Sequence, residues 1–314
     1  MDNKALYQSV CDTANIPIHA QYWWMCATAV GKQWDVIAVR NGQGKPVAML
    51  PVHIWQRFGV RCVVMPPHTQ LTWLWKDLGV NKAEIYPRMA KEIDAYLRKH
   101  HIALFYIQGY FPEELLRALE FYRCVVKERV TYRIAPTDME QLFHAFSTNK
   151  QRLIKKAAKN GILLSTLSVD GFYAVHSRFL AQKGKKIDYP LSMFEALASE
   201  AIRRNQGCIM AAVDSDAQVL AAVFLVWDSE VCYYLLPTYN ADYANSGAMA
   251  WLTMQAIQFA FQRGLVFDFE GSMSPSIANS YAQFGSSPAT YYSVEKVHPL
   301  VGTLLRLKNM LIHS

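Results

Sequence analysis

The sequence predicts an α/β protein with mixed sheets that contains two copies of one module. Strand-like and helix-like segments alternate along the chain, the same order of elements occurs twice, and the copies are offset by roughly 160–175 residues. The chain has 314 residues, of which 52% are hydrophobic, and this is enough for two cores of ordinary size. We therefore expect an N-terminal module at residues 1–135 and a C-terminal module at residues 136–314.

The first copy begins with a predicted hairpin at residues 34–55, in which two apolar strands flank the glycine-rich turn Asn41-Gly42-Gln43-Gly44. A third strand is expected near residues 60–71. The predicted elements that follow are a helix at 82–100, a strand at 102–110, a short helix at 112–122 and a strand at 124–135.

The second copy repeats this order. A hairpin at 208–227 turns at Asp214-Ser215-Asp216, and a strand at 230–239 follows it. The later elements are a helix at 246–263, a strand at 265–272, a short helix at 276–285 and a strand at 289–297. Four additional helices are expected before this copy, at 138–147, 149–160, 171–184 and 191–207.

Three stretches of the second half carry motifs that resemble those of a known family. "FDFEGSMSPSIANSYAQFG" (267–285) contains D-F-x-G and a later F-G, "NKQRLIKKAAKNGI" (149–162) is a basic helix, and "FLAQKGKK" (179–186) ends in a basic-glycine turn. With Gly247 opening a helix, the order of elements resembles the GNAT (N-acetyltransferase) fold. Two such modules in tandem resemble the bacterial FemAB-like acyltransferases.

The resemblance implies an N-acyltransferase. Its donor would be acetyl-CoA or another acyl-CoA bound by the second module, and a small-molecule amine acceptor would bind between the modules. FemAB-like enzymes that use aminoacyl-tRNA usually carry a functional lysine after D-F-x-G, whereas residues 273–290 contain none. Two alternatives stay open: a transferase that takes its donor from charged tRNA and acts on a cell-wall precursor, and a catalytically silent binding protein of the same fold.

The start of the helix at 246–263 is the predicted donor site. Free backbone N–H groups and small residues at a helix start allow a pyrophosphate to approach closely. A plain N-cap on a core helix is the alternative interpretation. The predicted cofactor-binding residues are Asn245, Ser246, Gly247 and Ala248, with Lys183 and Lys185 of the basic-glycine turn.

Two carboxylates in the strand at 265–272 are the predicted catalytic groups. Asp268 and Glu270 alternate with Phe267 and Phe269, so both carboxylates should face one side of the sheet. Because acyl transfer requires a deprotonated amine, we predict Glu270 as the general base and Asp268 as the group that orients it or holds the amine. Asp268 has an alternative role, which is to cap the loop or to pair with a buried Arg or Lys.

Tyrosines and basic residues complete the predicted site. In the GNAT fold a tyrosine often protonates the leaving thiolate, and Tyr281 and Tyr291 are the main candidates, with Tyr292 beside them. A packed core tyrosine is the alternative for each, since the chain has 17 tyrosines. The predicted substrate-binding residues are His68 and Gln70 in the proline-rich loop at 66–75, and Arg152 and Lys156 on the basic helix.

The composition of the chain suggests which kind of partner it binds and in which compartment it is found. The net charge of +7 suggests an anionic partner. The six cysteines are far apart and form no C-x-x-C pair, so we expect reduced thiols and no metal site. We predict no transmembrane helix and no signal peptide, and hence a cytoplasmic protein. The basic amphipathic segment at 298–314 is expected to dock onto its own protein.

Overall fold

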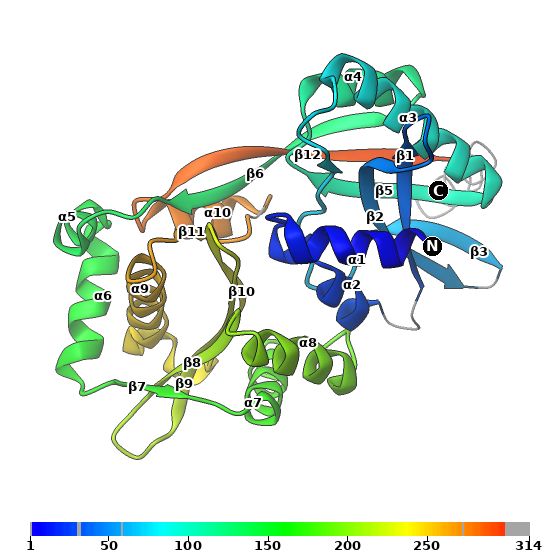
Figure 1. The fold of residues 1–314 in the computed structure, drawn as a ribbon. Helices are drawn as coiled ribbons and strands as arrows, with labels where there is room; N and C mark the ends of the chain where they lie inside the picture. The colour runs from blue at the N-terminus through cyan, green and yellow to red at the C-terminus, as the bar shows by residue number, and fades with distance from the viewer. Residues whose placement is uncertain (1, 30–32, 58, 272, 299–314) are drawn as a thin grey trace, which may run out of the picture. The chain divides into compact units, whose positions relative to one another are not determined.

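The computed structural model describes residues 2–29, 33–57, 59–271 and 273–298, and these form two compact units (Figure 1). The first unit contains residues 1–129 and the segment from Thr290 onward, and the second contains Val130–Ala289. The predicted segment at 298–314 lies outside the described residues, apart from His298.

The first unit is a mixed sheet covered by helices on both faces (Figure 1). Its strands follow the order β1-β2-β3-β5-β12, in which β3 and β5 are parallel, and β4 pairs with β2. Strand β12 (Ser287–Val297) belongs to this unit from Thr290 onward. The elements are α1 (Asn3–Thr13), η1 (Ile18–Ala20), α2 (Tyr22–Thr28), β1 (Trp34–Arg40), β2 (Pro46–Arg57), β3 (Val60–Val64), β4 (Trp75–Lys76), α3 (Lys82–Lys99), β5 (Ile102–Gly109) and α4 (Glu113–Phe121).

Strand β1 shows why both faces of this sheet are covered. Side chains alternate between the two faces of a strand. Ile37 and Val39 are buried in the core that includes α3 and α4, whereas Trp34 and Val36 are buried in the core that includes α1 and α2. A strand that is apolar on both faces requires a helical layer on each.

The second unit is also a sheet between two helical layers. Its strand order is β6-β11-β10-β9-β8-β7, with β10 and β11 parallel. The elements are β6 (Val125–Ile134), which enters this unit at Val130, α5 (Met139–Ala145), α6 (Thr148–Lys159), β7 (Leu163–Thr166), α7 (Val169–Ala181), α8 (Leu191–Arg203), β8 (Gly207–Val213), β9 (Val219–Trp227), β10 (Val231–Tyr239), η2 (Ala241–Ser246), α9 (Ala248–Phe261), β11 (Val266–Asp268) and α10 (Pro275–Ala282).

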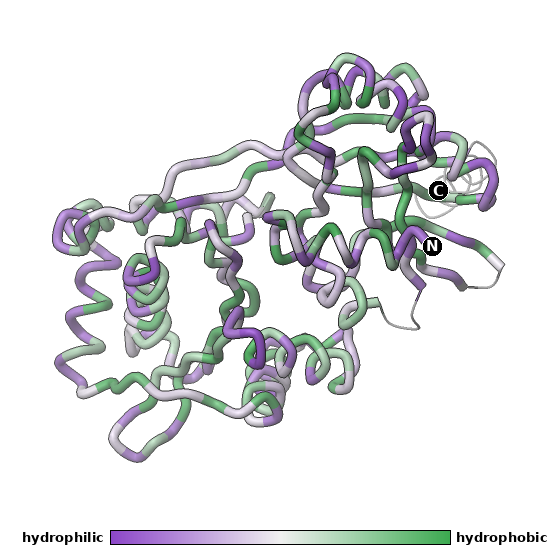
Figure 2. The backbone as a smooth tube through the Cα atoms, viewed as in Figure 1, coloured by the Kyte–Doolittle hydropathy of each residue, from purple (hydrophilic) through white to green (hydrophobic). Residues whose placement is uncertain are grey.

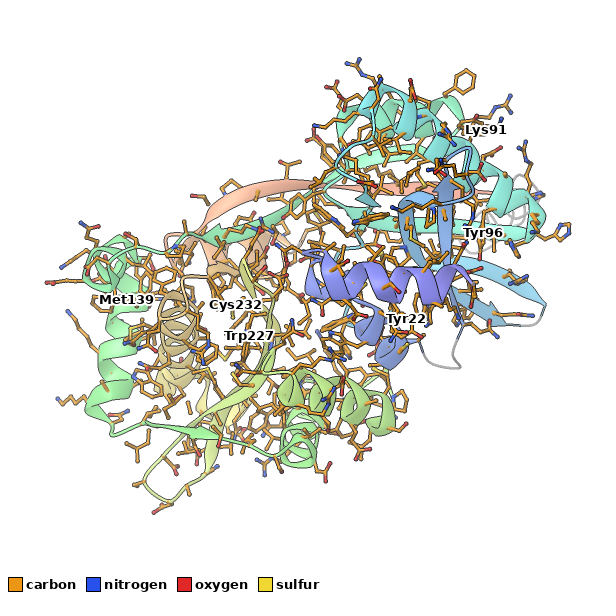
Figure 3. The ribbon with its side chains drawn as sticks, viewed as in Figure 1. Tyr22, Lys91, Tyr96, Met139, Trp227 and Cys232 are labelled. Carbon is orange, nitrogen blue, oxygen red and sulfur yellow. The ribbon has the colours of Figure 1, made fainter. Side chains whose placement is uncertain are left out.

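Helix α6 and the central strands of the second unit differ in polarity. Polar residues dominate α6, whereas β8, β9 and β10 are mostly apolar (Figure 2). Helix α9 is buried between α6 and the sheet, which explains why apolar residues cover most of its circumference. Trp227 of β9 and Cys232 of β10 belong to the same core (Figure 3), and all six cysteines are free thiols.

The predicted elements are present, and the doubled order of elements is confirmed. The sequence analysis missed α1, α2 and the short strands β4 and β7. One prediction was wrong in detail: the strand expected at 265–272 ends at Asp268, and Glu270 adopts a left-handed backbone with φ of 61°. No helix among the described segments is long and apolar enough to cross a membrane.

The last strand of each sequence copy completes the other copy's unit. Strand β6 ends the first copy, but Ile134 and Arg133 pair with Phe267 and Asp268 of β11. Strand β12 ends the second copy, but its run from Tyr292 onward pairs with β5. The compact units therefore group the chain differently from the ranges 1–135 and 136–314 that the repeat suggested.

Candidate functional site

A cavity forms in the second unit where two parallel strands part. Strand β11 pairs with β10 from Val231 to Tyr233 and ends at Asp268, while β10 continues to Tyr239. The pairing of β10 with β9 is also irregular between Tyr234 and Leu236. The cavity has a volume of about 460 Å³. Its described lining residues are Lys150, Leu153, Tyr234, Pro237, Tyr239, Ala244, Gly247, Met249, Ala250, Thr253, Phe269, Ser276, Ile277, Ser280, Tyr281 and Phe284.

Gly247 allows the start of α9 to reach this cavity. Its φ is 85°, and a Cβ atom at this position would collide with the carbonyl oxygen of Leu153 in α6. Glycine is therefore required both by the left-handed backbone and by the close approach of α6. The other predicted donor-site residues lie beside it: Lys156 Nζ donates to the carbonyl oxygen of Asn245 (2.8 Å), and Ser246 Oγ accepts from the N–H of Ala248 (3.2 Å).

The cavity is electropositive at this end. No acidic residue occupies the first turn of α9, so the partial positive charge of the helix start is not offset by its own side chains. Lys150 of α6 also lines the cavity, donates to Ser280 Oγ (3.0 Å) and lies 4.5 Å above the centre of the Phe284 ring. Burial lowers the pKa of Lys150.

Sequence reasoning missed Lys150. It selected Arg152 and Lys156 from the same helix, but Arg152 is exposed and donates to Asn149 Oδ1 (3.1 Å). The helical periodicity separates a basic stripe from an apolar one, and Lys150 lies outside the stripe that was chosen. Only the packing of α6 against α10 distinguishes it from the solvated lysines.

Asp268 is a buried structural anchor. Its side chain is fully buried and accepts hydrogen bonds from Thr131 Oγ1 (2.5 Å), Arg133 Nε (2.7 Å) and the backbone N–H of Glu270 (2.8 Å). The alternative role that the sequence left open for Asp268, pairing with a basic residue, is therefore present, although Arg133 is only partly buried. The carboxylate joins β6, β11 and the turn that follows.

Glu270 and Tyr281 lie near each other at the end of β11. Burial, with a further contribution from the negative charges of Glu270 and Asp268, raises the pKa of Tyr281 to about 12. The ring of Tyr281 lines the cavity and stacks on Phe269, with 4.4 Å between ring centres. The phenol is thus protonated at neutral pH, as a proton donor must be.

The basic-glycine turn at residues 183–186 lies near the end of β10. Lys183 Nζ lies 3.3 Å from the centre of the Tyr239 ring, and Tyr239 lines the cavity. The preceding Gln182 donates to Asn240 Oδ1 (3.0 Å) and accepts from the N–H of Ala241, which ties the turn to the segment before α9. Lys185 is exposed in the same turn.

The remaining predicted residues gather in the first unit. Gln70 Nε2 donates to the hydroxyl of Tyr291 (3.4 Å), whose ring lies 6.1 Å from that of Tyr110. His68 belongs to the same loop and has a φ of 54°. None of these residues lines the cavity at β10 and β11.

Comparisons with known proteins agree with this fold. Residues 144–275 match the family model of the acetyltransferase (GNAT) domain. The crystal structure of FemX superimposes with a TM-score of 0.67 at 11% identity, covering 96% of this chain and 97% of FemX. The chain therefore has the tandem GNAT fold, and its second half matches the GNAT domain in sequence.

Other solved structures share the arrangement. A tandem GNAT protein from the clavulanic acid biosynthesis pathway matches with a TM-score of 0.57 at 12% identity, covering 94% of this chain and 93% of that one. The structure of L-PGS from Bacillus licheniformis matches with a TM-score of 0.60 at 11% identity, and the match covers 98% of this chain and 96% of that one. The sequence has no match among curated proteins.

The GNAT match contains most of the residues that build the cavity. It includes α6, the start of α9 and the end of β11, and the matched domain is that of acetyltransferases. No group of His, Cys, Asp and Glu among the described residues is arranged to hold a metal ion.

Proposed function

We propose that this protein is an N-acyltransferase that takes an acyl group, such as acetyl, from an acyl-CoA bound between β10 and β11 and transfers it to an amine of a small molecule. The observation that carries the proposal is the cavity at the parting of these strands, with the start of α9 on its wall. Anions bind well at such helix starts.

The lining residues fit such a donor. The first turn of α9, which reaches the cavity through Gly247, Met249 and Ala250, and the ammonium group of Lys150 would hold phosphate oxygens. The rings of Phe269 and Tyr281, with Pro237, give the apolar surface that an acyl or pantetheine arm requires. Lys183, above Tyr239, is the candidate for a further phosphate contact.

The reaction needs a base and an acid. Glu270 would accept a proton from the acceptor ammonium, after which the amine nitrogen forms a bond to the thioester carbonyl carbon and the C–S bond breaks. Tyr281 would donate its proton to the leaving thiolate, the nitrogen would release its second proton to solvent as the amide forms, and the phenolate and the protonated Glu270 would return to their starting states by exchange with solvent. Asp268 would act as a positioning residue, because its hydrogen bond to the Glu270 N–H fixes the turn.

Calorimetry with acetyl-CoA, longer acyl-CoAs and free CoA tests the proposal. Replacing Gly247 would damage packing, so Ala244→Trp is the better variant: Ala244 is exposed and lines the cavity. We expect micromolar binding by the native chain and loss of binding in Ala244→Trp. Ala282→Trp, an exposed position of α10 outside the lining, is the matched control and should bind normally.

Absence of binding to every CoA species would overturn the acyl-CoA proposal. Charged tRNA would then be the donor to test, with a binding constant expected to fall steeply with salt if the exposed basic face of α6 contacts phosphates. Absence of both would favour a silent binding protein.

A further inference from the structure

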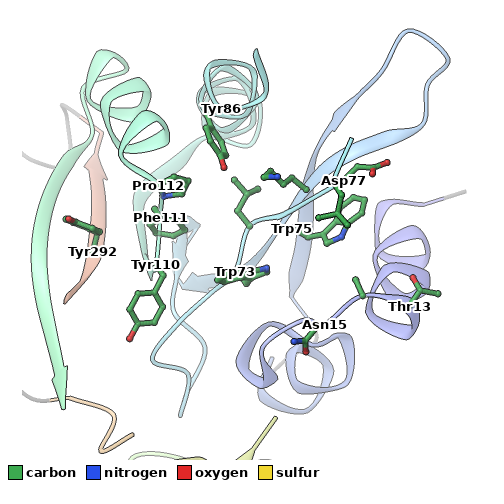
Figure 4. Close-up of a pocket in the computed structure, with 14 residues that line it drawn as sticks. Thr13, Asn15, Trp73, Trp75, Asp77, Tyr86, Tyr110, Phe111, Pro112 and Tyr292 are labelled. Carbon is green, nitrogen blue, oxygen red and sulfur yellow. The ribbon is translucent and has the colours of Figure 1, made fainter. Parts of the chain in front are cut away.

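The first unit contains a larger cavity, of about 840 Å³, within the usual range for small-molecule sites (Figure 4). The end of α1, the segment around β4, the start of α3 and the segment between β5 and α4 supply its walls, with one residue from β12. The described lining residues are Thr13, Ala14, Asn15, Trp73, Leu74, Trp75, Lys76, Asp77, Leu78, Tyr86, Tyr110, Phe111, Pro112 and Tyr292.

Aromatic rings dominate this lining. Six of the described residues carry one: Trp73, Trp75, Tyr86, Tyr110, Phe111 and Tyr292. Tyr86 projects from α3 toward the cavity, and Trp73 and Trp75 come from the segment that crosses it (Figure 4). Ring faces at several angles provide broad, flat apolar surface for a ligand.

The surrounding structure holds these rings in place. Trp75 is fixed in β4 by pairing with Met49 of β2. Tyr110 packs edge-on against Tyr291, which accepts a hydrogen bond from Gln70. Tyr86 is only 4% exposed. A cavity with fixed aromatic walls is pre-organised for binding.

Polar groups and charge define the ligand further. Five of the six rings carry an indole N–H or a phenol hydroxyl, and Thr13 and Asn15 add short polar side chains. Lys76 and Asp77 are the two charged residues of the described lining, so its formal charge is zero. The surface is therefore apolar in its faces, rich in hydrogen-bonding groups at its edges, and neutral.

An uncharged sugar matches all three properties. Its C–H faces are apolar and stack on aromatic rings, while its hydroxyls require donors and acceptors around the rim. A phosphate-bearing ligand would need an excess of cations, and an acyl chain would leave the indole N–H and phenol groups without hydrogen-bond partners. An ammonium group also binds aromatic ring faces but has no use for the hydroxyl-rich rim.

We propose that the cavity of the first unit binds an uncharged sugar unit and, resting on the proposed function, that this sugar belongs to the acceptor. The test is saturation-transfer NMR and calorimetry of the full chain with the methyl glycosides of glucose, galactose, N-acetylglucosamine and N-acetylgalactosamine. Dodecanoate, choline and AMP represent the competing ligand classes. No donor is added, so the result does not depend on acyl transfer.

At least one glycoside is expected to bind with millimolar or better affinity, and Trp73→Ala should weaken this binding at least tenfold. Tyr110→Ala serves as a second variant in case the first fails to fold. Trp55→Ala is the matched control, since Trp55 is 44% exposed on β2 and does not line the cavity.

The proposal is overturned if no glycoside binds, if both variants bind the glycoside as well as the native chain, or if the cavity residues instead control binding of dodecanoate, choline or AMP. Glycoside binding without acyl-CoA binding would preserve the sugar site and remove the proposed function. Acyl-CoA binding without glycoside binding would do the reverse.

Discussion

Each unit contains one pair of parallel strands that separates beyond its paired residues, but the space between the strands is open in the second unit and filled by the chain in the first. In the second unit β10 and β11 separate around a cavity. In the first unit, where β3 and β5 are the parallel pair, the loop after β3 returns to β5: the N–H of Thr72 donates to the Gln108 oxygen (2.7 Å), and Met65 Sδ accepts from the Gln108 N–H (3.3 Å). The chain itself occupies the position that remains open in the other copy.

The helices that precede the second parallel strand of each unit, α3 and α9, also differ in how well their N-terminal ends could bind an anion. Helix α3 of the first unit has a side-chain cap, since Asn81 accepts from the N–H of Ala83, and Glu84 lies in its first turn. In α9 a side chain also accepts from the helix start, since Ser246 Oγ accepts from the N–H of Ala248, but no acid lies in the first turn. An acid in the first turn makes a helix start a poor anion site, so the anionic donor proposed above fits the second unit better than the first.

Removal of a buried carboxylate should have the largest effect. In each unit one such carboxylate binds basic partners: Asp268 binds Arg133 at 2.7 Å, and Asp94 binds Lys296 at 2.6 Å and Arg98 at 2.9 Å. We expect Asp268→Asn and Asp94→Asn each to reduce the free energy of unfolding by roughly 3 kcal/mol. Chemical denaturation measures this loss.

Only one of these variants should alter the site. Asp268→Asn should also weaken acyl-CoA binding or turnover, because Asp268 holds the turn at Glu270, whereas Asp94→Asn should leave both unchanged. Asp216→Asn in the exposed turn between β8 and β9 controls for loss of a surface charge. Equal effects of both variants on donor binding would contradict the division between the units.

Glu270→Gln should remove the general base. We expect kcat to fall about 100-fold while the affinity for acyl-CoA is unchanged, since base catalysis typically contributes at least this factor. Steady-state kinetics with an identified acceptor, together with calorimetry, separates the two. Glu140→Gln, at an exposed position of α5, is the control. A parallel loss of donor affinity would assign Glu270 to binding instead.

Gly109 in the first unit and Gly247 in the second test the two places where the parallel strands separate. A Cβ atom at Gly109 would lie 2.7 Å from the oxygen of Thr72, and one at Gly247 would collide with that of Leu153. Each Gly→Ala change should therefore reduce the free energy of unfolding by about 1–3 kcal/mol. Gly247→Ala should also lower acyl-CoA affinity, and Gly109→Ala should not. Loss of donor binding in Gly109→Ala would place a donor contact in the first unit.

The smallest expected effect concerns Tyr281. Its pKa is raised to about 12 in the folded protein, above the ordinary value of 10, so the neutral phenol is favoured by folding. The associated stability is present below pH 10 and is lost as the pH rises from 10 to 12. Alkaline denaturation of Tyr281→Phe should show a smaller loss over this range than the native chain. An identical loss in both would indicate that Tyr281 titrates normally.

The sequence by itself determined the elements and their doubled order. Hydrophobic periodicity, caps and turn residues act over a few positions, so the hairpins, the helices at 82–100 and 246–263 and the helix start at Gly247 could be predicted from them. Asp268 and Glu270 could be selected as candidates for the same reason, because two carboxylates beside a glycine at a strand end form a local pattern.

Only the tertiary structure decided which of these residues act together. Asp268 meets Thr131 and Arg133 across more than 130 residues of sequence, Lys150 meets Ser280 across a separation of 130, and Thr72 closes onto Gln108. The exchange of β6 and β12 between the units and the aromatic cavity also join distant segments. Such pairings depend on shape and burial that no local periodicity encodes, so the same module is closed in one copy and open in the other.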